Sequence, residues 1–468
     1  MRNILMMVVL ALTAGCAAVG PDYSPPQIDL PGSFTEQNSS PIEASRLSKW
    51  WQSFDDPHLT DLIEHSLEAN MELKAAFQRI SAAHALYGIA RADQLPTVSG
   101  NTSYARARDF FPGAQPENQW SLGGRLSWEI DLFGRIRRSV EAGSADLEGQ
   151  AEQMRDLQVL TVAEVASTYL QAVSLKERLA IAERNVGAQR RSREIADNRF
   201  ETGVTAGLDP AQAKLNLFST QTIVPRLELA LRRSLNRLAV LLGEDPSGVE
   251  ALLPDAVVLP EVPEELMVGV PADLLRNRPD IRAAERRLAA QTARIGVAEA
   301  QRYPSVNLRG AWTWLANTPS DVFGDAIEFG SVGPLISVPI FNNGRLRSQV
   351  GAEEARAREL ELALRQQVLI AQEEVENALI AVIQDRQLVA LLGEAAQAAA
   401  SSVQFARNLY SSGKSDFQNV LDAQRSLFSL EDQGAQSRLA VLLDIVELYR
   451  SLGGGWSDEP KSETPPSP

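Results

Sequence analysis

The side chains best suited to chemistry are few in this sequence and lie far apart. The three histidines, His58, His65 and His84, have no cysteine or second histidine pair beside them that would complete a metal site. The glycine run at 453–455 is not a phosphate loop, because the lysine and the serine or threonine of such a loop are missing. No nucleophile stands with a base in a catalytic pattern. We therefore expect no enzyme, no metal site and no cofactor.

The single cysteine, Cys16, lies in a context that predicts modification. A short basic start is followed by an apolar segment over 4–12 and by small residues at 13–15. This pattern predicts a secretory signal over 1–15 that is too short to be a membrane anchor. A cysteine directly after the cleavage point resembles a bacterial lipobox, although Thr13 stands where leucine is usual. The expectation is an N-palmitoyl and S-diacylglycerol cysteine, with Ala17 favouring the outer membrane. The alternative is a plain signal peptide.

Charge and hydropathy exclude some classes of protein. The chain has 468 residues, 44% of them hydrophobic and 22% charged, and its net charge is −15. Nucleic acid is disfavoured as a partner, since binding of phosphates needs a basic face. After residue 16 no apolar run reaches the roughly 18 residues of a membrane-spanning helix. The acidic balance fits either a solvated surface or an acidic, water-filled lumen.

The stretch 134–202 predicts one long helix. It contains no proline, and apolar or small residues recur at alternating spacings of four and three, which is a heptad seam. Such a helix is on the order of 100 Å long at 1.5 Å per residue. Gln158, Thr161 and Thr168 interrupt the seam, and Asp385 interrupts its counterpart near the C-terminus. We interpret these breaks as positions on a side that faces a water-filled channel.

Two segments alternate with the period of strands. The segment 97–132 places Trp120 and Trp128 on an apolar face and serines, Arg125 and Glu129 on the other, which predicts a hairpin. The segment 305–341, with Trp312 and Trp314, predicts a second hairpin. The four tryptophans suit an aromatic girdle at a membrane surface. The alternative is that they form the core of a soluble sandwich.

The chain repeats itself with an offset of 210 residues. From Arg135 onward every matched pair has this offset, for example Gly203 with Gly413 and Leu242 with Leu452, and the long helices recur with it; the hairpins recur as well, as Val98 and Val306 show. Asp209 and Pro210 are expected to cap the helix 209–242, and Pro225 to kink it.

The expected organisation is as follows: signal peptide 1–15; lipidated tether and belt 16–55; repeat 1 at 56–243 with hairpin 97–132 and helices 134–202 and 209–242; connector 244–278; repeat 2 at 279–453 with hairpin 305–341 and helices 344–412 and 417–452; disordered tail 454–468.

Four strands in one chain cannot close a barrel. A lipid-facing sheet must pair every backbone group, which only a closed barrel achieves, and known bacterial barrels have at least eight strands. We therefore expect several chains to share one barrel, with eight strands from two chains or twelve from three.

Several motifs resemble a known family. The start from Cys16 to Tyr23 resembles lipoprotein outer-membrane efflux factors, the TolC-like group with OprM and NodT relatives. The same resemblance holds for further groups of residues: Trp50, Trp51, Phe54 and Pro57; Asn70, Leu73 and Arg79; Pro271, Arg278, Pro279 and Asp280; Leu421, Asp422, Ala423 and Gln424. It covers almost the whole chain after the signal.

The resemblance implies a mainly α fold with β strands. Three chains would form a twelve-stranded transmembrane β-barrel, continued by a helical coiled-coil barrel in the periplasm. The segments 40–60 and 244–278 would form an equatorial belt. The implied location is the outer membrane of a Gram-negative bacterium. The implied partners are a periplasmic adaptor protein and an inner-membrane transporter of the RND type.

The resemblance also implies a constriction at the turns 203–208 and 413–418. Asp422 matches a constriction carboxylate, and Asn419 stands where the family has a second one. Three copies of Asp422 in a narrow lumen would favour cations; the alternative is a surface carboxylate. Tyr410 matches a tyrosine that bonds across helices, or it is ordinary seam packing. Asp416 either lines the entrance or caps a helix.

The function that follows is a passive exit duct for small molecules in a tripartite efflux pump. A channel for type I protein secretion has the same fold and stays open as an alternative. A periplasmic coiled-coil scaffold without a pore is the alternative from another class.

Overall fold

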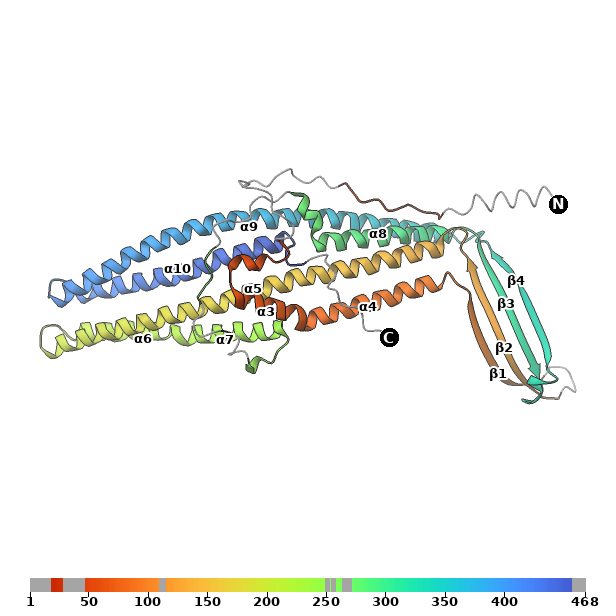
Figure 1. Cartoon of the computed structure of the whole chain (residues 1–468), viewed down its shortest axis with the longest axis horizontal. Helices are drawn as coiled ribbons and strands as arrows, with labels where there is room; N and C mark the ends of the chain where they lie inside the picture. Colours follow the sequence, from red (N-terminus) through yellow and green to blue (C-terminus); the bar gives the residue numbers. More distant parts are fainter. Residues whose placement is uncertain are drawn as a thin grey trace. The chain divides into compact units, whose positions relative to one another are not determined.

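The computed structural model describes residues 18–27, 47–108, 115–248, 253, 258–262 and 272–456. The described chain is mainly helical, with one four-stranded antiparallel sheet (Figure 1). It divides into two compact units. Unit 1 comprises Met1–Ile28, Phe77–Gln153 and Asp280–Gln366; unit 2 comprises Asp29–Ala76, Met154–Pro279 and Gln367–Pro468. None of the helices in the described ranges has both the length and the apolar character needed to cross a membrane.

The sheet of unit 1 is built from two hairpins. Its strands are β1 (Thr97–Ala107), β2 (Glu117–Ile130), β3 (Ser305–Ala316) and β4 (Ile327–Ser337). They pair in the order β1-β2-β3-β4, so β1 and β4 are its two edges. The 3-10 turn η4 (Asp321–Phe323) lies between β3 and β4. The second hairpin ends at Ser337 and is therefore four residues shorter than the predicted 305–341.

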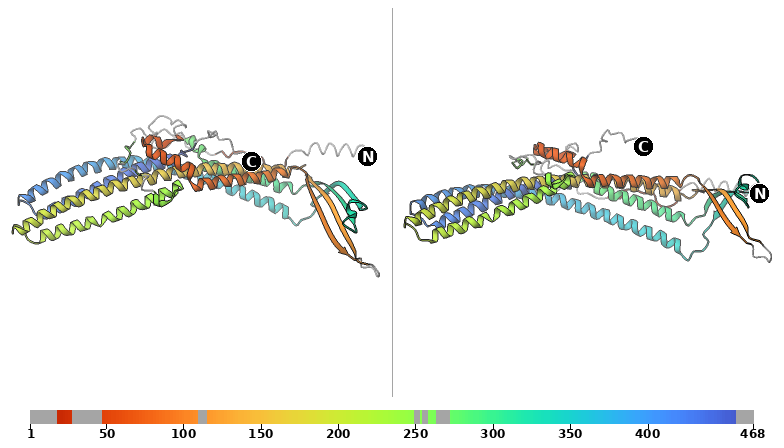
Figure 2. Two further views of the ribbon diagram at one scale, coloured as in Figure 1. Left: turned by 60° about the horizontal axis from the view of Figure 1, so that its bottom comes forward. Right: turned by 90° about the horizontal axis from the view of Figure 1, so that it is seen from below.

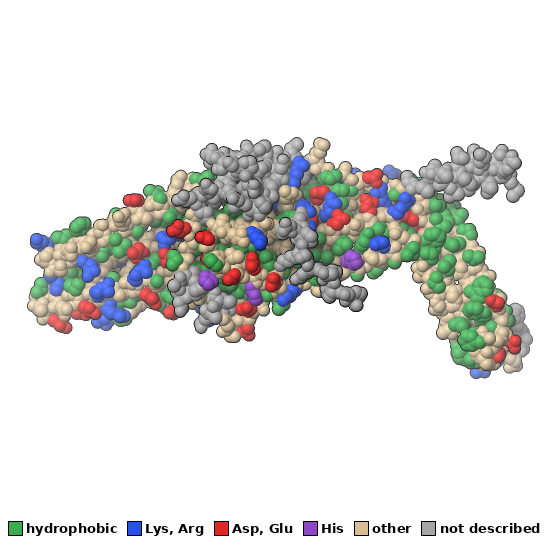
Figure 3. Space-filling model, viewed as in Figure 1, with side chains coloured by type: hydrophobic (Ala, Val, Ile, Leu, Met, Phe, Trp, Pro, Cys, Tyr) green, Lys and Arg blue, Asp and Glu red, His purple; other side chains and the backbone are tan. Residues whose placement is uncertain are grey.

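The four tryptophans that are expected to form an aromatic girdle all lie on one face of this sheet. The register places Trp120 opposite Ala316 and Trp314 opposite Leu122, and side chains alternate between faces along each strand. Trp128 lies near the helical end of the sheet, where its Nε1 donates to the carbonyl of Gln94 at 3.0 Å. Figure 3 shows hydrophobic side chains gathered over the sheet.

The other tryptophans lie farther along the strands. Trp120 packs against Tyr104 with ring centroids 4.6 Å apart, toward the loop end. Trp312 lies in the middle of β3 and covers Gly330, where an added Cβ would come within 3.0 Å of the indole. Glycine at position 330 therefore makes room for the ring.

The helices of unit 1 are held by ion pairs and small residues. Its helical segments belong to α4 (Met71–Ala92), α5 (Arg135–Glu201), α8 (Pro279–Ala300) and α9 (Arg345–Ser411). Arginines spaced along α8 pair with carboxylates of α5: Arg282 with Glu152 at 2.8 Å, Arg286 with Glu148 at 3.2 Å, and Arg294 with Asp146 at 2.5 Å. Buried alanines from the same two helices pack between these pairs.

Unit 2 contains the remaining helices. These are η1 (Trp50–Phe54), α3 (Pro57–Ala69), α6 (Leu208–Gln221), α7 (Ile223–Leu242), η3 (Ala272–Asn277) and α10 (Phe417–Ser451), with parts of α5 and α9. Within unit 2, α5 runs beside α6, and α9 runs beside α10, in all views (Figures 1 and 2). The polypeptide therefore forms two helical hairpins here, one ending in the turn after Glu201 and one ending in the turn after Ser411.

The N-terminal motifs of unit 2 act as packing anchors. Trp50 stacks on Tyr449 of α10, with ring centroids 5.1 Å apart. Asp56 accepts from two backbone N–H groups at the start of α3, and its other oxygen accepts from the hydroxyl of Tyr169 at 2.7 Å. Asn70 ends α3 and donates to the carbonyl of Leu241 at 2.9 Å. These polar groups join chain segments that are distant in the sequence.

The helix expected over 209–242 is interrupted. Thr222 separates α6 from α7, three residues before Pro225. A proline has no N–H and clashes with the preceding turn, so a break just upstream of Pro225 is its expected effect. The expected cap is wrong, however: the N-cap is Gly207, and Asp209 lies in the first helical turn, where it accepts a hydrogen bond from another helix.

The interpretation of the seam of α5 also needs correction. Thr161 and Thr168 are only 4% and 7% exposed, so they do not face open water in this chain. Thr161 satisfies its hydroxyl by donating to the carbonyl of Leu157 at 2.7 Å. Val162, Val165, Ala166 and Tyr169 are buried as well, so several sides of α5 are covered near these threonines. A heptad seam predicts only one packed side and cannot predict this.

Candidate functional site

The ends of the two long helices carry the same turn. Gly203 and Gly413 both have φ +74°, a conformation that glycine adopts without strain. Gly203 donates to Phe200 O at 2.9 Å, and the next residue donates to Arg199 O at 2.9 Å. Gly413 and Lys414 make the same two bonds to Tyr410 and Leu409, at 3.0 and 2.9 Å. This is the Schellman ending of a helix, which reverses the chain sharply.

A small apolar core lies under these turns. It consists of Ala196, Ala213, Tyr410, Phe417, Val420 and Leu421, all buried. The rings of Tyr410 and Phe417 lie 5.0 Å apart. Because α5, α6, α9 and α10 all contribute to it, this core joins the ends of both helical hairpins.

Tyr410 is held from two sides by polar groups of the first hairpin. Its hydroxyl donates to Asp209 Oδ2 at 3.0 Å. Burial, the hydrogen bond with Asp209 and its negative charge raise the pKa of Tyr410 to about 12. The guanidinium of Arg199 lies 4.7 Å from the ring centroid and donates to the carbonyls of Tyr410 and Ser411. We call Arg199, Asp209 and Tyr410 the tip link.

Two more polar contacts join the hairpins above the tip link. Gln424 Nε2 donates to Ser192 Oγ at 2.9 Å in a buried position. Arg425 Nε donates to Asn216 Oδ1 at 2.8 Å. Both run from α10 to the first hairpin, so they support the same junction.

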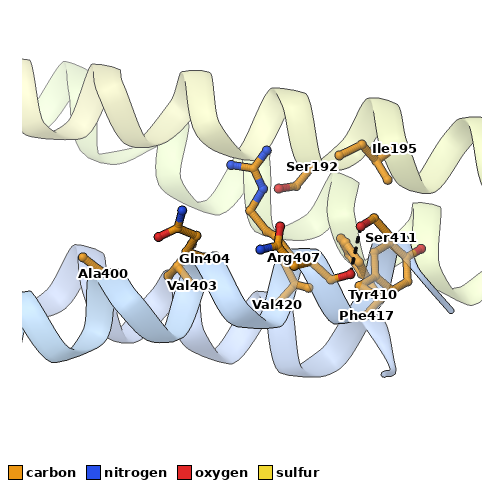
Figure 4. Close-up of a pocket in the computed structure, with 11 residues that line it drawn as sticks. Ser192, Ile195, Ala400, Val403, Gln404, Arg407, Tyr410, Ser411, Phe417 and Val420 are labelled. Atoms are coloured by element: carbon orange, nitrogen blue, oxygen red, sulfur yellow. Dashed lines mark hydrogen bonds between the residues drawn. The ribbon is translucent and has the colours of Figure 1, made fainter. Parts of the chain in front are cut away.

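A groove of about 550 Å³ adjoins the tip link (Figure 4). Ser192 and Ile195 of α5 form one wall, and Gln404 and Arg407 of α9 form the other. Phe417 and Val420 of α10 also line the groove. Its walls therefore combine apolar and polar side chains.

The predicted constriction residues lie on the first turns of α10. Asp422 is exposed, accepts from Gln418 Nε2 at 2.9 Å and lies 4.0 Å from Arg425. Asn419 is exposed and donates to Ser415 Oγ at 2.8 Å. Asp416 occupies the N-cap of α10, but its side chain makes no capping bond. Asp422 and Asn419 are three residues apart, so they share one helix face, away from buried Tyr410.

Sequence reasoning gave Arg199 no role, expected Asp209 only as a helix cap, and named Gln424 only as part of a motif, so it missed their contacts between the hairpins. The repeat held a signal for one of them, Asp209, and for its partner Tyr410. With the offset of 210, Tyr410 corresponds to Phe200 and Asp209 to Asn419, so the phenol and the carboxylate exist in only one copy each. A hydroxyl and a carboxylate that each appear at only one of two matched positions were the clue that a specific bond forms there.

A second feature of unit 2 predicts a pH dependence. Burial, the negative charge of Asp385 and a hydrogen bond with it, and the charge of Glu447 raise the pKa of Asp444 to about 6. An unfolded Asp titrates near 3.9, so the folded state holds this proton more tightly. The resulting stabilisation is complete below about pH 4 and is lost as the pH rises through 6.

Asp444→Asn is therefore expected to flatten the pH dependence of stability. Thermal unfolding followed by circular dichroism at pH 4 and pH 7 measures it, and the variant should gain stability over the wild type only at pH 7. Asp325→Asn, in an exposed loop, is the control. An equal change at both pH values would contradict the prediction.

Cys16 lies outside the described residues, so its role stays a prediction. Within the described ranges, no three His, Cys, Asp or Glu side chains group as metal ligands would.

Comparisons with known proteins bring these features together. The profile of the family described as outer membrane efflux protein matches residues 62–244 and again 270–454. Nodulation protein T of Rhizobium leguminosarum bv. viciae is 32% identical over 470 residues, covering 98% of this chain and 95% of that protein. The toluene efflux pump outer membrane protein TtgI of Pseudomonas putida is 30% identical over 466 residues, covering 97% and 98%.

Solved structures agree in fold. The outer-membrane channel OprN is 37% identical with a TM-score of 0.87, and the match covers 94% of this chain and 100% of that one. The MtrE outer membrane channel of Neisseria gonorrhoeae, in its open state, is 26% identical with a TM-score of 0.83, covering 94% and 99%.

Proposed function

Because this chain belongs to the outer membrane efflux protein family, we propose that three copies of it assemble into one exit duct for small molecules. The chain is an outer-membrane channel of an efflux system, which confirms the family resemblance in its sequence. In the proposed assembly, four strands from each chain give a twelve-stranded barrel in the outer membrane. The long helices of the three chains form the periplasmic part.

The observation that carries this proposal is the sheet with two open edges. Within the described chain, β1 and β4 each pair on one side only, and one sheet face is apolar. Unpaired backbone groups in lipid cost several kcal/mol each, so a membrane sheet has to close. A second copy that pairs its β1 with this β4 would satisfy those two edges, and the β1 of this chain would pair in the same way with the β4 of a third copy. Three copies related by a threefold axis give a closed ring.

Exposed apolar side chains on the helices support the same assembly. Leu86 and Ile89 of α4 are 66% and 63% exposed, and Leu362 and Leu369 of α9 are 67% and 59% exposed. Soluble monomers rarely leave such rows uncovered. We propose that α9 of one chain covers α4 of the next.

The repeat that we propose has support in the backbone. Glycines in the left-handed region occur in pairs that are 210 residues apart: Gly134 and Gly344, Gly203 and Gly413, Gly243 and Gly453. Each pair marks an equivalent turn at a helix end. The two separate matches of the family profile favour the same division, with repeat 1 at 56–243 and repeat 2 at 279–453.

We propose that the tryptophans anchor the barrel at the membrane surfaces. Trp128 at the helical end of the sheet and Trp120 and Trp314 toward its loops fit two girdles. Trp312 lies between these levels, so we assign it to the lipid-facing wall.

The tip of the duct is proposed to lie at the two Schellman turns. Asp422 and Asn419, on the exposed face of α10, would surround the lumen in a trimer, with Asp416 at the entrance. Asp422→Ala is expected to raise the single-channel conductance of purified trimers about twofold, because the smaller alanine side chains widen the path where three copies meet. Planar-bilayer recording measures it, with Asp325→Ala in an outer loop as the control. An unchanged conductance would count against a ring at Asp422.

We propose lipidation of Cys16, with residues 16–55 as tether and part of an equatorial belt. The stacking of Trp50 on Tyr449 supports a belt position for this segment. Cys16→Ala is expected to remove the lipid mass but leave the trimer and the barrel intact, because the edges that assemble them are distant in sequence. Intact-mass spectrometry measures the lipid, and a wild-type protein without it refutes the assignment.

The proposed partners are a periplasmic adaptor and an inner-membrane transporter of the RND type. The names of its relatives include toluene efflux and nodulation, so the cargo is left open among small molecules. Type I protein secretion remains the second candidate. Co-purification with an RND transporter supports the first function, and co-purification with an ABC exporter the second.

Conductance and stoichiometry test the proposal together. Light scattering on detergent-solubilised protein is expected to give three chains per particle, and the particles are expected to conduct ions in planar bilayers. Monomers, or trimers without current even after the tip link is broken, would leave a pore-free scaffold as the better description.

A further inference from the structure

The polar face of the sheet carries two arginines on neighbouring strands. Along the described strands, the charged residues on this face are Glu117, Arg125, Glu129 and Arg309. Arg125 of β2 is paired with Ala311 of β3, which is two residues from Arg309, so the arginines are diagonal neighbours. Diagonal positions lie about 7 Å apart, within reach of long side chains.

Every residue paired with these arginines is small. Arg125 lies between Ser99 of β1 and Ala311 of β3. Arg309 lies between Ser127 of β2 and Gly333 of β4. Neither arginine is covered by its neighbours, and both are exposed. The two guanidiniums therefore extend away from the sheet.

The carboxylates of the same face do not neutralise them. Glu129 is paired with Asn307 and is therefore a diagonal neighbour of Arg309, but it accepts from Arg135 through both of its oxygens, each at 2.8 Å, so Arg135 balances its charge. Glu117 is eight residues from Arg125 along β2, about 27 Å at 3.4 Å per residue. Within the described ranges, neither Arg125 nor Arg309 takes part in a hydrogen bond or an ion pair. Two guanidiniums at diagonal positions repel each other and neither gains a partner from the sheet, so folding does not explain this pair.

We propose that Arg125 and Arg309 form a basic collar inside the barrel that binds anionic groups in passage. This inference rests on the proposed trimer, in which the polar face lines the lumen and the pair occurs three times. Guanidiniums hold carboxylate, phosphate and sulfate groups through paired N–H donors. Low-dielectric walls strengthen their field and concentrate anions.

The collar would give the duct two filters of opposite sign. Asp422 at the tip would favour cations, whereas Arg125 and Arg309 lie in the half of the sheet that is nearer to the helices and would favour anions. The cargo that suits both is a molecule that bears an anionic group together with a cationic or neutral part. The net charge of −15 gives no hint of this, because it sums over the whole chain.

Ion selectivity tests the collar. Purified trimers carrying Arg199→Ser and Tyr410→Phe, which break the tip link, are recorded in a tenfold KCl gradient, and the reversal potential gives the ratio of potassium to chloride permeability. Arg125→Ser with Arg309→Ser is expected to raise this ratio on the order of tenfold, the lower end of such focusing effects. Arg125→Lys with Arg309→Lys, which keeps the charge, should stay within twofold of the parent. Arg106→Gln removes an arginine from the opposite face of β1 and is the matched control.

The outcomes are separable. A parent protein that does not conduct overturns the proposed duct, and the collar with it. A conducting protein whose permeability ratio is unchanged by the serine pair overturns the collar alone. If the serine pair prevents assembly, Arg125→Gln with Arg309→Gln takes its place, with the same expected increase. A ratio that rises equally in the Arg106→Gln control would also overturn the collar, because the effect would not belong to the lumen.

Discussion

Trimers of the Arg199→Ser, Tyr410→Phe double variant are expected to conduct on the order of ten times more current than the wild type. Tyr410→Phe removes only the hydroxyl that donates to Asp209 at 3.0 Å and keeps the ring in its core. Arg199→Ser removes the cation over that ring and two bonds to the end of α9. Each lost bond costs roughly 1 kcal/mol, and the buried acceptors left behind add to this. Three chains lose the link at once, so the separated state of the two hairpins gains population.

Planar-bilayer recording measures the conductance, and uptake of a large antibiotic by intact cells reports the same opening in the outer membrane. The matched control is Arg193→Ser, on the same helix. Arg193 pairs with Asp197 at 3.3 Å within α5 and does not join the hairpins through that pair. A double variant that conducts like Arg193→Ser would show that the tip link does not hold the duct closed.

Local periodicity made much of the fold predictable. A stretch free of proline with a heptad pattern predicted a helix over 134–202, and α5 occupies Arg135–Glu201. Alternation predicted which faces of the strands are apolar, because side chains of a strand point to opposite sides without exception. Both signals are carried by neighbouring residues. Tertiary packing did not have to be known for either of them.

The tip link was not predictable in the same way. Tyr410 and Asp209 are 201 residues apart, and their contact depends on how two hairpins pack. The expectation that Asp209 caps a helix came from a local rule, and the long-range hydrogen bond prevailed over that rule. Thr161 and Thr168 show the same limit, since a seam describes one packed side and they lie where several elements meet.

The repeat shows where the two halves diverge. Arg135 pairs with Glu129 in the first half. Arg345 matches Arg135 in the second half, but residues 337–341 before it contain no carboxylate, so this ion pair has no counterpart there. Comparing matched positions for lost partners was possible from the sequence alone, and it identifies polar groups with a role specific to one half.

Arg278→Ala is expected to have the largest effect on stability, a loss of about 3 kcal/mol, typical of breaking a buried ion pair. The Arg278 side chain is 6% exposed and lies 2.9 Å from Glu374 Oε2 of α9. Its Nη1 also donates to the carbonyl of Ser451 at 2.6 Å, where α10 ends. The pair therefore joins the start of α8 to α9 and α10, which explains the Arg278 motif in structural terms.

The reason for the loss is desolvation. Without Arg278, Glu374 keeps only Arg450, at 3.3 Å, while the alanine leaves a cavity and an unpaired carbonyl. Chemical unfolding followed by helical circular dichroism measures the shift in midpoint. Arg358→Ala is the control: this arginine is 74% exposed and pairs with Glu354 at 3.5 Å, a contact worth no more than about 0.5 kcal/mol.

A second substitution separates the charge from the cavity. Adding Glu374→Gln to Arg278→Ala removes the poorly compensated carboxylate, so the double variant is expected to lose less than the sum of the single changes. Strict additivity would mean that the ion pair contributes nothing and that Arg278 acts by filling space. A midpoint for Arg278→Ala equal to that of Arg358→Ala would contradict the prediction altogether. Removal of a buried guanidinium with two partners should lower the stability more than removal of an exposed one.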